Sequence, residues 1–186
     1  MSGPGPFRLP ARLVPEESFP PYSYVTGRFP HPTSDPLGHS YAHAAPAVPS
    51  VQPERWSNSR AYLFACDLFN YGYYWESHEL WEALWHACGR SGPTANMLKG
   101  LIKLAAAGVK VREGRTAGLQ RHAKRAAELF ENVQTEIRED HYLGLDLVRL
   151  IAIAQELTRR PITTGLANGP VEVVFDFQLL PGSAAE

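Results

Sequence analysis

The sequence predicts an all-α protein, a compact array of about five helices with a proline-rich N-terminal arm and a short extended C-terminal tail. Three observations support this class. Eleven of the sixteen prolines lie before residue 50. From about residue 54 to 160, apolar side chains recur at helical spacing. The segments between these helical patterns are short, which favours antiparallel neighbours in a bundle or helical array.

Residues 1–50 form the proline-rich arm. Proline fixes φ and removes a hydrogen-bond donor, so this segment can hold neither a long helix nor a central strand. Two interpretations stay open: a disordered extension, or an extended arm that packs on the helical domain. Disordered tails are poor in aromatic residues, so the aromatic side chains of the arm favour packing. These side chains are Phe19, Tyr22, Tyr24, Phe29 and Tyr41.

Glycine, asparagine and proline mark the ends of the predicted helices. Asn70-Tyr71-Gly72 ends the first helix and Gly89 ends the second. A Ser-Gly-Pro-Thr run begins the third helix, because proline is tolerated in a first turn. Gly114 ends this helix, and Pro161 stops the fifth. The predicted helices cover about 54–71, 74–88, 91–113, 116–138 and 144–159.

The C-terminal tail has a different pattern from the helices. Between residues 171 and 178, valine and phenylalanine alternate with other side chains, which is the two-residue period of a strand. A single strand needs a partner, and the arm near residues 22–25 is the candidate within the chain. We therefore divide the chain into an arm (1–50), a helical domain (51–160) and an extended tail (161–186) that holds one possible strand.

Composition and cysteine usage predict a soluble cytoplasmic protein. The net charge is −1 and the pI is about 6.7, so there is no general basic surface of the kind that nucleic-acid binders carry. Cys66 and Cys88 fall at different heights of the predicted helix pair, so we expect no disulfide and a reducing compartment. The N-terminus lacks an apolar signal region, and the apolar stretches are too short to span a bilayer.

The predicted helix 74–88 carries the most informative pattern in the chain. On a helical wheel His78, Glu82 and His86 fall within about 80° of one another, each four residues from the last. Glu79 lies beside Glu82. One edge of this helix therefore combines histidine and glutamate beside a wall of apolar side chains, which are expected in the core. The core-facing residues are Trp81, Leu84, Trp85 and Cys88.

Two kinds of chemistry fit this edge. Imidazole and carboxylate groups one turn apart are good ligands for a divalent metal, which makes such an ion the candidate cofactor. The candidate metal ligands are His78, Glu82 and His86, with Glu79 placed to orient or activate water. The pattern His-Glu-x-x-Glu has the spacing of a zincin motif with a carboxylate replacing the second histidine, and no third downstream ligand is identifiable. Alternatively, a carboxylate desolvated against a tryptophan would have a raised pKa suited to acid/base work.

A purely structural role is the plainer interpretation of the same edge. Lys99, Lys103 and Lys110 fall within about 40° of one another on the next predicted helix. The acidic edge of one helix and the basic edge of its neighbour would then face each other as ion pairs.

The two central helices also resemble a known family. Asparagine, glycine and an aromatic residue precede a Glu-x-His-Glu-x-Trp-Glu-x-x-Trp pattern, and a Gly-Leu-Ile-x-x-Ala-Ala-Ala helix follows. This combination is similar to the domain-of-unknown-function family 309, whose members are small, mostly prokaryotic, all-helical proteins. The resemblance covers about residues 60–135 and implies a compact helical array centred on these two helices, but no activity. The matching residues are Asn70, Gly72, Trp75, Glu76, His78, Glu79, Trp81, Glu82, Trp85, Gly100, Leu101, Ile102 and Ala105–Ala107.

A run of basic residues follows these helices. From Lys99 to Arg125 there are eight lysines and arginines against one acid, Glu113. Such a run can bind phosphate or an RNA backbone, although a solvated helix face is the plainer interpretation and no RNA-binding signature is present. The anion-binding candidates are Lys99, Lys103, Lys110, Arg121, Lys124 and Arg125. The arm could add His31 or His39 to a metal site, whereas His122 and His141 are expected to be ordinary surface or boundary histidines.

Three functions stay open, and the sequence does not decide whether the protein is an enzyme. The first is a binding or scaffold protein with a pocket for a small ligand, a protein partner or a second copy of the chain. The second is a metal-dependent hydrolase that uses His78, Glu79 and Glu82. The third is an anion or RNA binder. The pocket candidates are Asn70, Trp75, Glu76, His78, Glu79, Trp81, Glu82 and Trp85.

Overall fold

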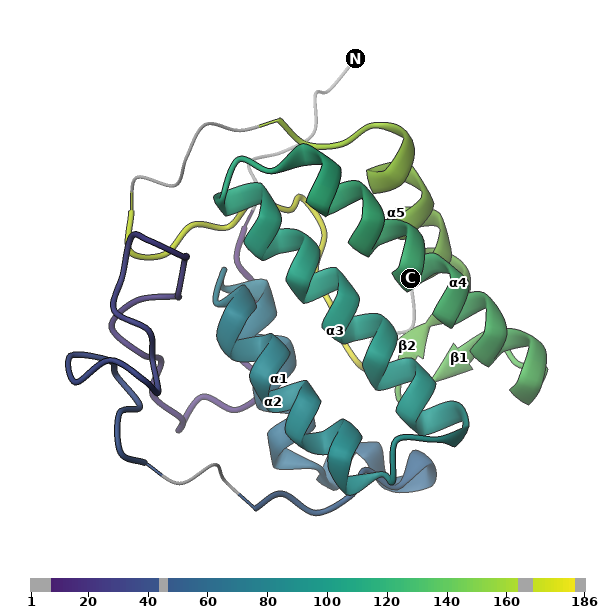
Figure 1. Ribbon diagram of the computed structural model, residues 1–186. Coiled ribbons are helices and arrows are strands. Elements are labelled where there is room, and N and C mark those ends of the chain that lie inside the picture. Colours follow the sequence, from purple (N-terminus) through teal and green to yellow (C-terminus); the bar gives the residue numbers. More distant parts are fainter. Residues whose placement is uncertain (1–7, 44–46, 164–168, 183–186) are drawn as a thin grey trace.

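The computed structural model describes residues 8–43, 47–163 and 169–182, and within them the chain is mostly helical (Figure 1). The predicted all-α class is confirmed, with one small two-stranded hairpin added. In chain order the elements are the 3₁₀-helix η1 (Pro53–Asn58), α1 (Arg60–Asn70), α2 (Tyr74–Ala87), α3 (Gly92–Arg112), α4 (Thr116–Ile137), β1 (His141–Tyr142), β2 (Leu145–Asp146) and α5 (Leu147–Arg159).

Helices that follow one another in the sequence pack side by side. α1 packs on α2, α2 on α3, α3 on α4, and α4 on α5, with α3 in the centre of the array (Figure 1). Short connections allow this arrangement because each helix turns back along its predecessor. The core between the helices contains completely buried side chains of every size, among them Tyr62, Trp81, Leu101 and Phe130.

The first predicted helix is in fact two elements. η1 begins at Pro53 and ends at Asn58, and Arg55 within it has the non-helical φ of −133°. Ser59 then adopts an extended conformation, and its side chain accepts a hydrogen bond from the backbone N–H of Tyr62. A serine in this position caps the N-terminus of a new helix. The prediction of one continuous helix from 54 was therefore wrong, and α1 begins at Arg60.

The fifth predicted helix begins later than expected, because a tight hairpin precedes it. Leu143 and Gly144 both have positive φ, 50° and 74°, as a two-residue hairpin turn requires. The turn pairs β1 with β2 in antiparallel register. The hydroxyl of Tyr62 donates to the carbonyl of Leu143 at 2.9 Å, which fixes the hairpin on α1. Asp146 caps α5 by accepting from the N–H of Arg149 at 2.9 Å.

The C-terminal tail does not form the expected strand within its described residues 169–182. The backbone N–H of Ser23 in the arm donates to the carbonyl of Pro170 in the tail at 2.9 Å. Side chains of the helices take the place of a strand partner. The N–H of Val174 donates to the hydroxyl of Tyr74 at 2.9 Å, so this backbone group is satisfied without a sheet.

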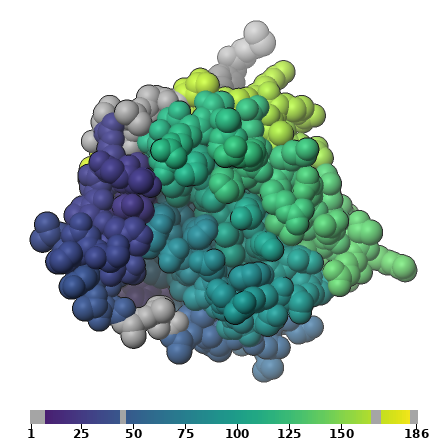
Figure 2. Space-filling view, viewed as in Figure 1, coloured from purple at the N-terminus to yellow at the C-terminus, as the bar shows by residue number. Residues whose placement is uncertain are grey.

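Residues 8–43 of the arm pack along α1 and α2, as Figures 1 and 2 show in purple and dark blue. Buried carboxylates hold the arm by accepting from its backbone N–H groups. The two oxygens of Asp67 accept from Leu13 and Val14, each at 2.8 Å. Phe19 adds ring contacts with α1 and the turn after it. Residues 8–43 thus have both hydrogen bonds and ring contacts to the helices.

The state of the two cysteines and the lengths of the apolar helices can be compared with the predicted reducing compartment and the predicted lack of a membrane span. Cys66 and Cys88 are both free. Burial raises the pKa of the Cys66 thiol, so this group is an inert core side chain. Within the described residues, no helix is both long enough and apolar enough to cross a bilayer.

Candidate functional site

The rotation of α2 about its axis determines which side chains face outwards. Gly72 precedes α2 with φ +88°, and a Cβ atom there would stand 2.6 Å from the carbonyl oxygen of Glu172. Ser77 donates from its hydroxyl to the carbonyl of Ala65 at 3.0 Å, and Trp81 is completely buried. With this face turned towards α1 and the core, the opposite edge of α2 is directed outwards.

That outer edge brings together His78, Glu79 and Glu82. Each residue offers one ligand atom, and the three atoms lie within 4.8 Å of one another. Nδ1 of His78 is 3.2 Å from Oε1 of Glu79, and these two side chains are 27% and 45% exposed. One imidazole nitrogen and two carboxylate oxygens form a donor set that suits zinc, manganese or iron. We call these three residues the α2 cluster.

The α2 cluster differs in one member from the predicted ligand set. His78 and Glu82 were predicted as ligands and lie in it, and Glu79, assigned to water activation, lies there too. His86, the third predicted ligand, is exposed and lies outside the group. Its ring instead contacts the neighbouring ring of Trp85 at 5.1 Å between centroids.

The arm occupies the first turn of α2. The ring of Trp75 contacts those of Tyr24 and His31, with centroids 5.4 and 5.5 Å apart. Glu76 is 7% exposed and accepts from the N–H of Tyr24 at 2.9 Å. Nε2 of His39 lies 3.2 Å from Oε1 of Glu76. The two arm histidines therefore contact Trp75 and Glu76, and neither belongs to the α2 cluster.

Three further pocket candidates contact other parts of the protein. The amide of Asn70 donates to the carbonyl of Leu179 at 2.9 Å and accepts from its N–H at 2.7 Å. Trp81 is completely buried in the aromatic cluster of the core. Trp85 is partly exposed, and the ammonium of Lys99 lies 5.3 Å from its ring centroid.

Glycines set the register between α2 and α3. A Cβ atom on Gly108 would stand 2.6 Å from Cγ of Tyr74, so the Tyr74 ring lies directly on the backbone there. At the other end of the pair, Lys99 lies over Trp85. Counting between these two antiparallel contacts places Lys103 beside the turn of α2 that carries residues 78–82.

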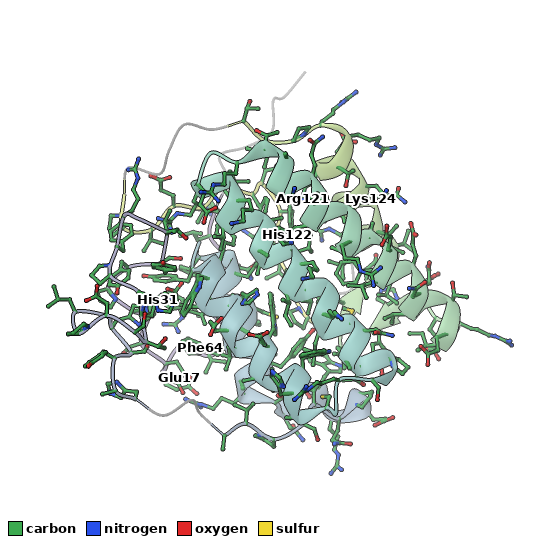
Figure 3. All side chains as sticks on the ribbon, viewed as in Figure 1. Glu17, His31, Phe64, Arg121, His122 and Lys124 are labelled. Atoms are coloured by element: carbon green, nitrogen blue, oxygen red, sulfur yellow. The ribbon has the colours of Figure 1, made fainter. Side chains whose placement is uncertain are left out.

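The register between α3 and α4 follows in the same way. A Cβ atom on Gly118 would meet the aliphatic part of Lys110, and one on Gly100 would overlap the ring of Phe130. Counting between these contacts places His122 beside Ala106, which is one turn from Lys103. Figure 3 shows His122 where α4 passes α3. His122 and the α2 cluster therefore flank the same stretch of α3 from opposite sides.

His122 lies in a strongly positive environment. Its ring is partly buried, and burial is the main cause that lowers its pKa to about 4. Nearby positive charge lowers the pKa further. His122 is therefore uncharged at neutral pH, and one ring nitrogen carries a lone pair. The groups that supply this positive charge are Lys103, Lys110, Arg121 and His78.

The predicted ion pairs between α2 and α3 are not formed among the described residues. Lys110 pairs with Glu113 at 2.6 Å. Arg125 pairs with Glu128 on its own helix at 2.7 Å. Arg121 and Lys124 are exposed on α4 (Figure 3). Within the part of the chain that the structure describes, Lys103 has neither an ion pair nor a hydrogen-bond partner for its ammonium.

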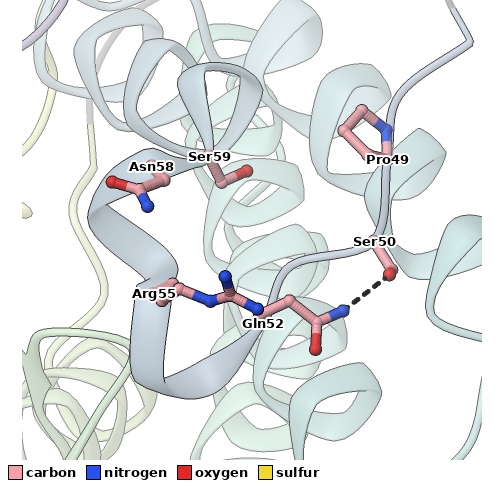
Figure 4. A pocket seen from close by; sticks show the side chains of 6 residues that line it. All are labelled: Pro49, Ser50, Gln52, Arg55, Asn58 and Ser59. Atoms are coloured by element: carbon pink, nitrogen blue, oxygen red, sulfur yellow. Dashed lines mark hydrogen bonds between the residues drawn. The ribbon is translucent and has the colours of Figure 1, made fainter.

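A cavity lies away from α2, beside η1. It has a volume of about 170 Å³ and is open to solvent beside η1 (Figure 4). Figure 4 also shows the hydrogen bond from the Gln52 amide to the Ser50 hydroxyl at its rim. The α2 cluster lies outside this cavity, on the surface, where the side chains of His78 and Glu79 are 27% and 45% exposed. The residues that line the cavity are Pro49, Ser50, Gln52, Arg55, Asn58 and Ser59.

The central helices match the model of a known protein family. Residues 62–122 match the model of a domain of unknown function, DUF309, so the chain carries a DUF309 domain over α1, α2, α3 and the start of α4. This confirms the resemblance that the sequence pattern indicated. The matched segment includes the whole α2 cluster and ends at His122. No curated protein matches the chain.

Proposed function

We propose that the protein is a metal-binding protein whose site is the α2 cluster. The convergence of the ligand atoms of His78, Glu79 and Glu82 within 4.8 Å carries this proposal. It keeps the first of the predicted functions, a binding protein, and names a divalent cation as the ligand. The aromatic part of the predicted pocket is left out, because Trp75 and Trp81 contact the arm and the core.

The chemistry of the cluster supports a borderline divalent ion. Three donors on adjacent turns of one rigid helix need little reorganisation, and a mixed nitrogen and oxygen set suits Zn²⁺, Mn²⁺ or Fe²⁺ better than Mg²⁺. Three protein ligands also leave coordination positions for water or for a ligand. The hydrolase alternative depends on the same cluster and on those open positions, so metal binding is the first property to establish.

The two free cysteines support a cytoplasmic location. Cys66 and Cys88 are unpaired, and a reducing compartment keeps such thiols free. We place the protein there, where manganese, iron and zinc compete for sites of this kind.

Calorimetric titration of the metal-free protein with Mn²⁺ and Zn²⁺ tests the proposal. We expect one site in the wild type and loss of that site in the double variant His78→Ala/Glu82→Ala. The matched control is His86→Ala, which removes an imidazole from the same helix but outside the cluster. Equal binding by the wild type and the double variant would exclude the α2 cluster. Loss of binding in His86→Ala alone would move the site one turn along α2.

A further inference from the structure

The three central helices present one continuous face around residues 103–106 of α3. The α2 cluster lies on one side of this stretch and His122 of α4 on the other, as the packing of Tyr74 on Gly108 and of Lys110 on Gly118 requires. Ala106 has a short side chain and is partly exposed between them. Groups from three helices can therefore reach a ligand bound over Ala106.

Lys103 is a cation on this face that has no ion pair within the described residues. It is partly buried, whereas Lys110 and Arg125 are neutralised by Glu113 and Glu128. A lysine stem is flexible, and its ammonium offers three hydrogen-bond donors. A metal ion on the carboxylates of the α2 cluster and an anion at the Lys103 ammonium would balance the charges on this face.

His122 also faces the charge of Lys103. Burial is the main cause that lowers the pKa of its ring, and the charge of Lys103 on α3 lowers it further. The uncharged ring still carries one N–H, which can donate to an anion without adding charge.

We infer that this face binds the phosphate group of a small phosphate-bearing ligand, with one phosphate oxygen on the metal ion of the α2 cluster and the others near Lys103 and His122. This inference rests on the proposed metal site. Divalent ions held by few protein carboxylates commonly complete their coordination with ligand phosphates, and lysine binds phosphate as a point charge. A nucleic-acid backbone is disfavoured, because the net charge of the chain is −1 and Arg125 is paired within α4.

The experiment uses Mn²⁺-loaded full-length protein and inorganic phosphate as the probe. Protein-bound Mn²⁺ shortens the ³¹P relaxation times of phosphate in direct contact with it, so relaxation reports binding at the metal. Mn²⁺ affinity is measured first on each protein. We expect phosphate to bind the wild type, and its Kd to rise about tenfold or more in Lys103→Gln, because one charge-assisted contact is lost.

Lys124→Gln is the matched control, since it removes the same charge from an exposed position on α4. It should leave the phosphate Kd unchanged. If Mn²⁺ does not bind, the proposed function and this inference are both overturned. If Mn²⁺ binds but phosphate does not contact it, or Lys103→Gln binds phosphate as the wild type does, this inference alone fails. Metal-independent binding of a short RNA that weakens in both variants would favour the basic-patch alternative instead.

Discussion

The ring of Tyr74 on α2 lies against the backbone of α3 at Gly108, where a Cβ atom would stand 2.6 Å from Cγ of the ring. Burial raises the pKa of Tyr74 to about 12, and its hydroxyl accepts from the N–H of Val174 in the tail. One residue pair therefore sets the separation of two helices and anchors the tail. It also places the α2 cluster beside Lys103.

Gly108→Ala should destabilise the protein by about 1–3 kcal/mol, because the new methyl group would displace a ring that is held on its other sides. Thermal or urea unfolding measures this change. Gly118→Ala is the control, since its Cβ would meet the flexible stem of Lys110 and alanine is the better helix former. If both variants unfold at the same temperature or urea concentration, the Tyr74 contact does not constrain the packing of α2 on α3.

Asn70→Ala should release the C-terminal tail. It removes both hydrogen bonds to Leu179 and leaves buried backbone groups without partners, which costs about 1–3 kcal/mol. Hydrogen exchange should quicken in residues 169–182 before the helices are affected. Asn132→Ala, at an exposed position of α4, should change neither the free energy of unfolding nor the hydrogen exchange of the tail. A tail that stays protected in Asn70→Ala would mean that its aromatic contacts suffice.

Asp67→Asn should loosen the arm. Both carboxylate oxygens accept from backbone N–H groups, and an amide can keep only one of these bonds. We expect the amides of Leu13 and Val14 to exchange faster, with a loss of about 1–3 kcal/mol in the free energy of unfolding. Asp176→Asn, on the exposed side of the tail, is the comparison. Unchanged exchange at both amides would show that other contacts hold this part of the arm.

The helices could be predicted because glycine and proline mark their ends, and α2, α3 and α4 lie within a few residues of the expected ranges. The break at Ser59 and the hairpin at Leu143-Gly144 were missed. A single serine or a Leu-Gly pair is a weak local signal against an apolar pattern that continues on both sides.

The candidate site could be predicted in part. His78 and Glu82 were found because residues four apart share a helix face. His122 was predicted only as a surface or boundary histidine, because its position beside α3 depends on tertiary contacts at Gly100 and Gly118, which no local pattern contains. Glu76 and Asn70 were predicted to line a ligand pocket, but they accept hydrogen bonds from the arm and the tail. A side chain that binds the protein's own backbone has the same chemistry as one that binds a ligand, so the sequence does not distinguish the two.

The titration of His122 gives a pH dependence with a defined sign. Its folded-state pKa of about 4 lies below the ordinary value of 6.5, so the unfolded chain binds more protons between these values. The contribution of His122 to the free energy of unfolding is fully present above pH 6.5 and is lost as the pH falls towards 4. The slope is at most about 1.4 kcal/mol per pH unit, and less because the ring is partly exposed.

NMR titration of the His122 ring checks this directly. Lys103→Gln should raise the His122 pKa because one of the positive charges that oppose protonation is removed. Lys124→Gln should leave the pKa where it is. A wild-type pKa near 6.5 would mean that the ring is open to solvent and does not face Lys103.

Elemental analysis of protein purified without a metal-affinity tag shows whether the α2 cluster holds a metal ion. We predict close to one equivalent of zinc, manganese or iron per chain in the wild type and in His86→Ala, and none in His78→Ala/Glu82→Ala with its fold intact by circular dichroism. Metal-free wild type that also fails to take up any of these ions on reconstitution would exclude a metal site at the α2 cluster. So would equal metal in the wild type and the double variant.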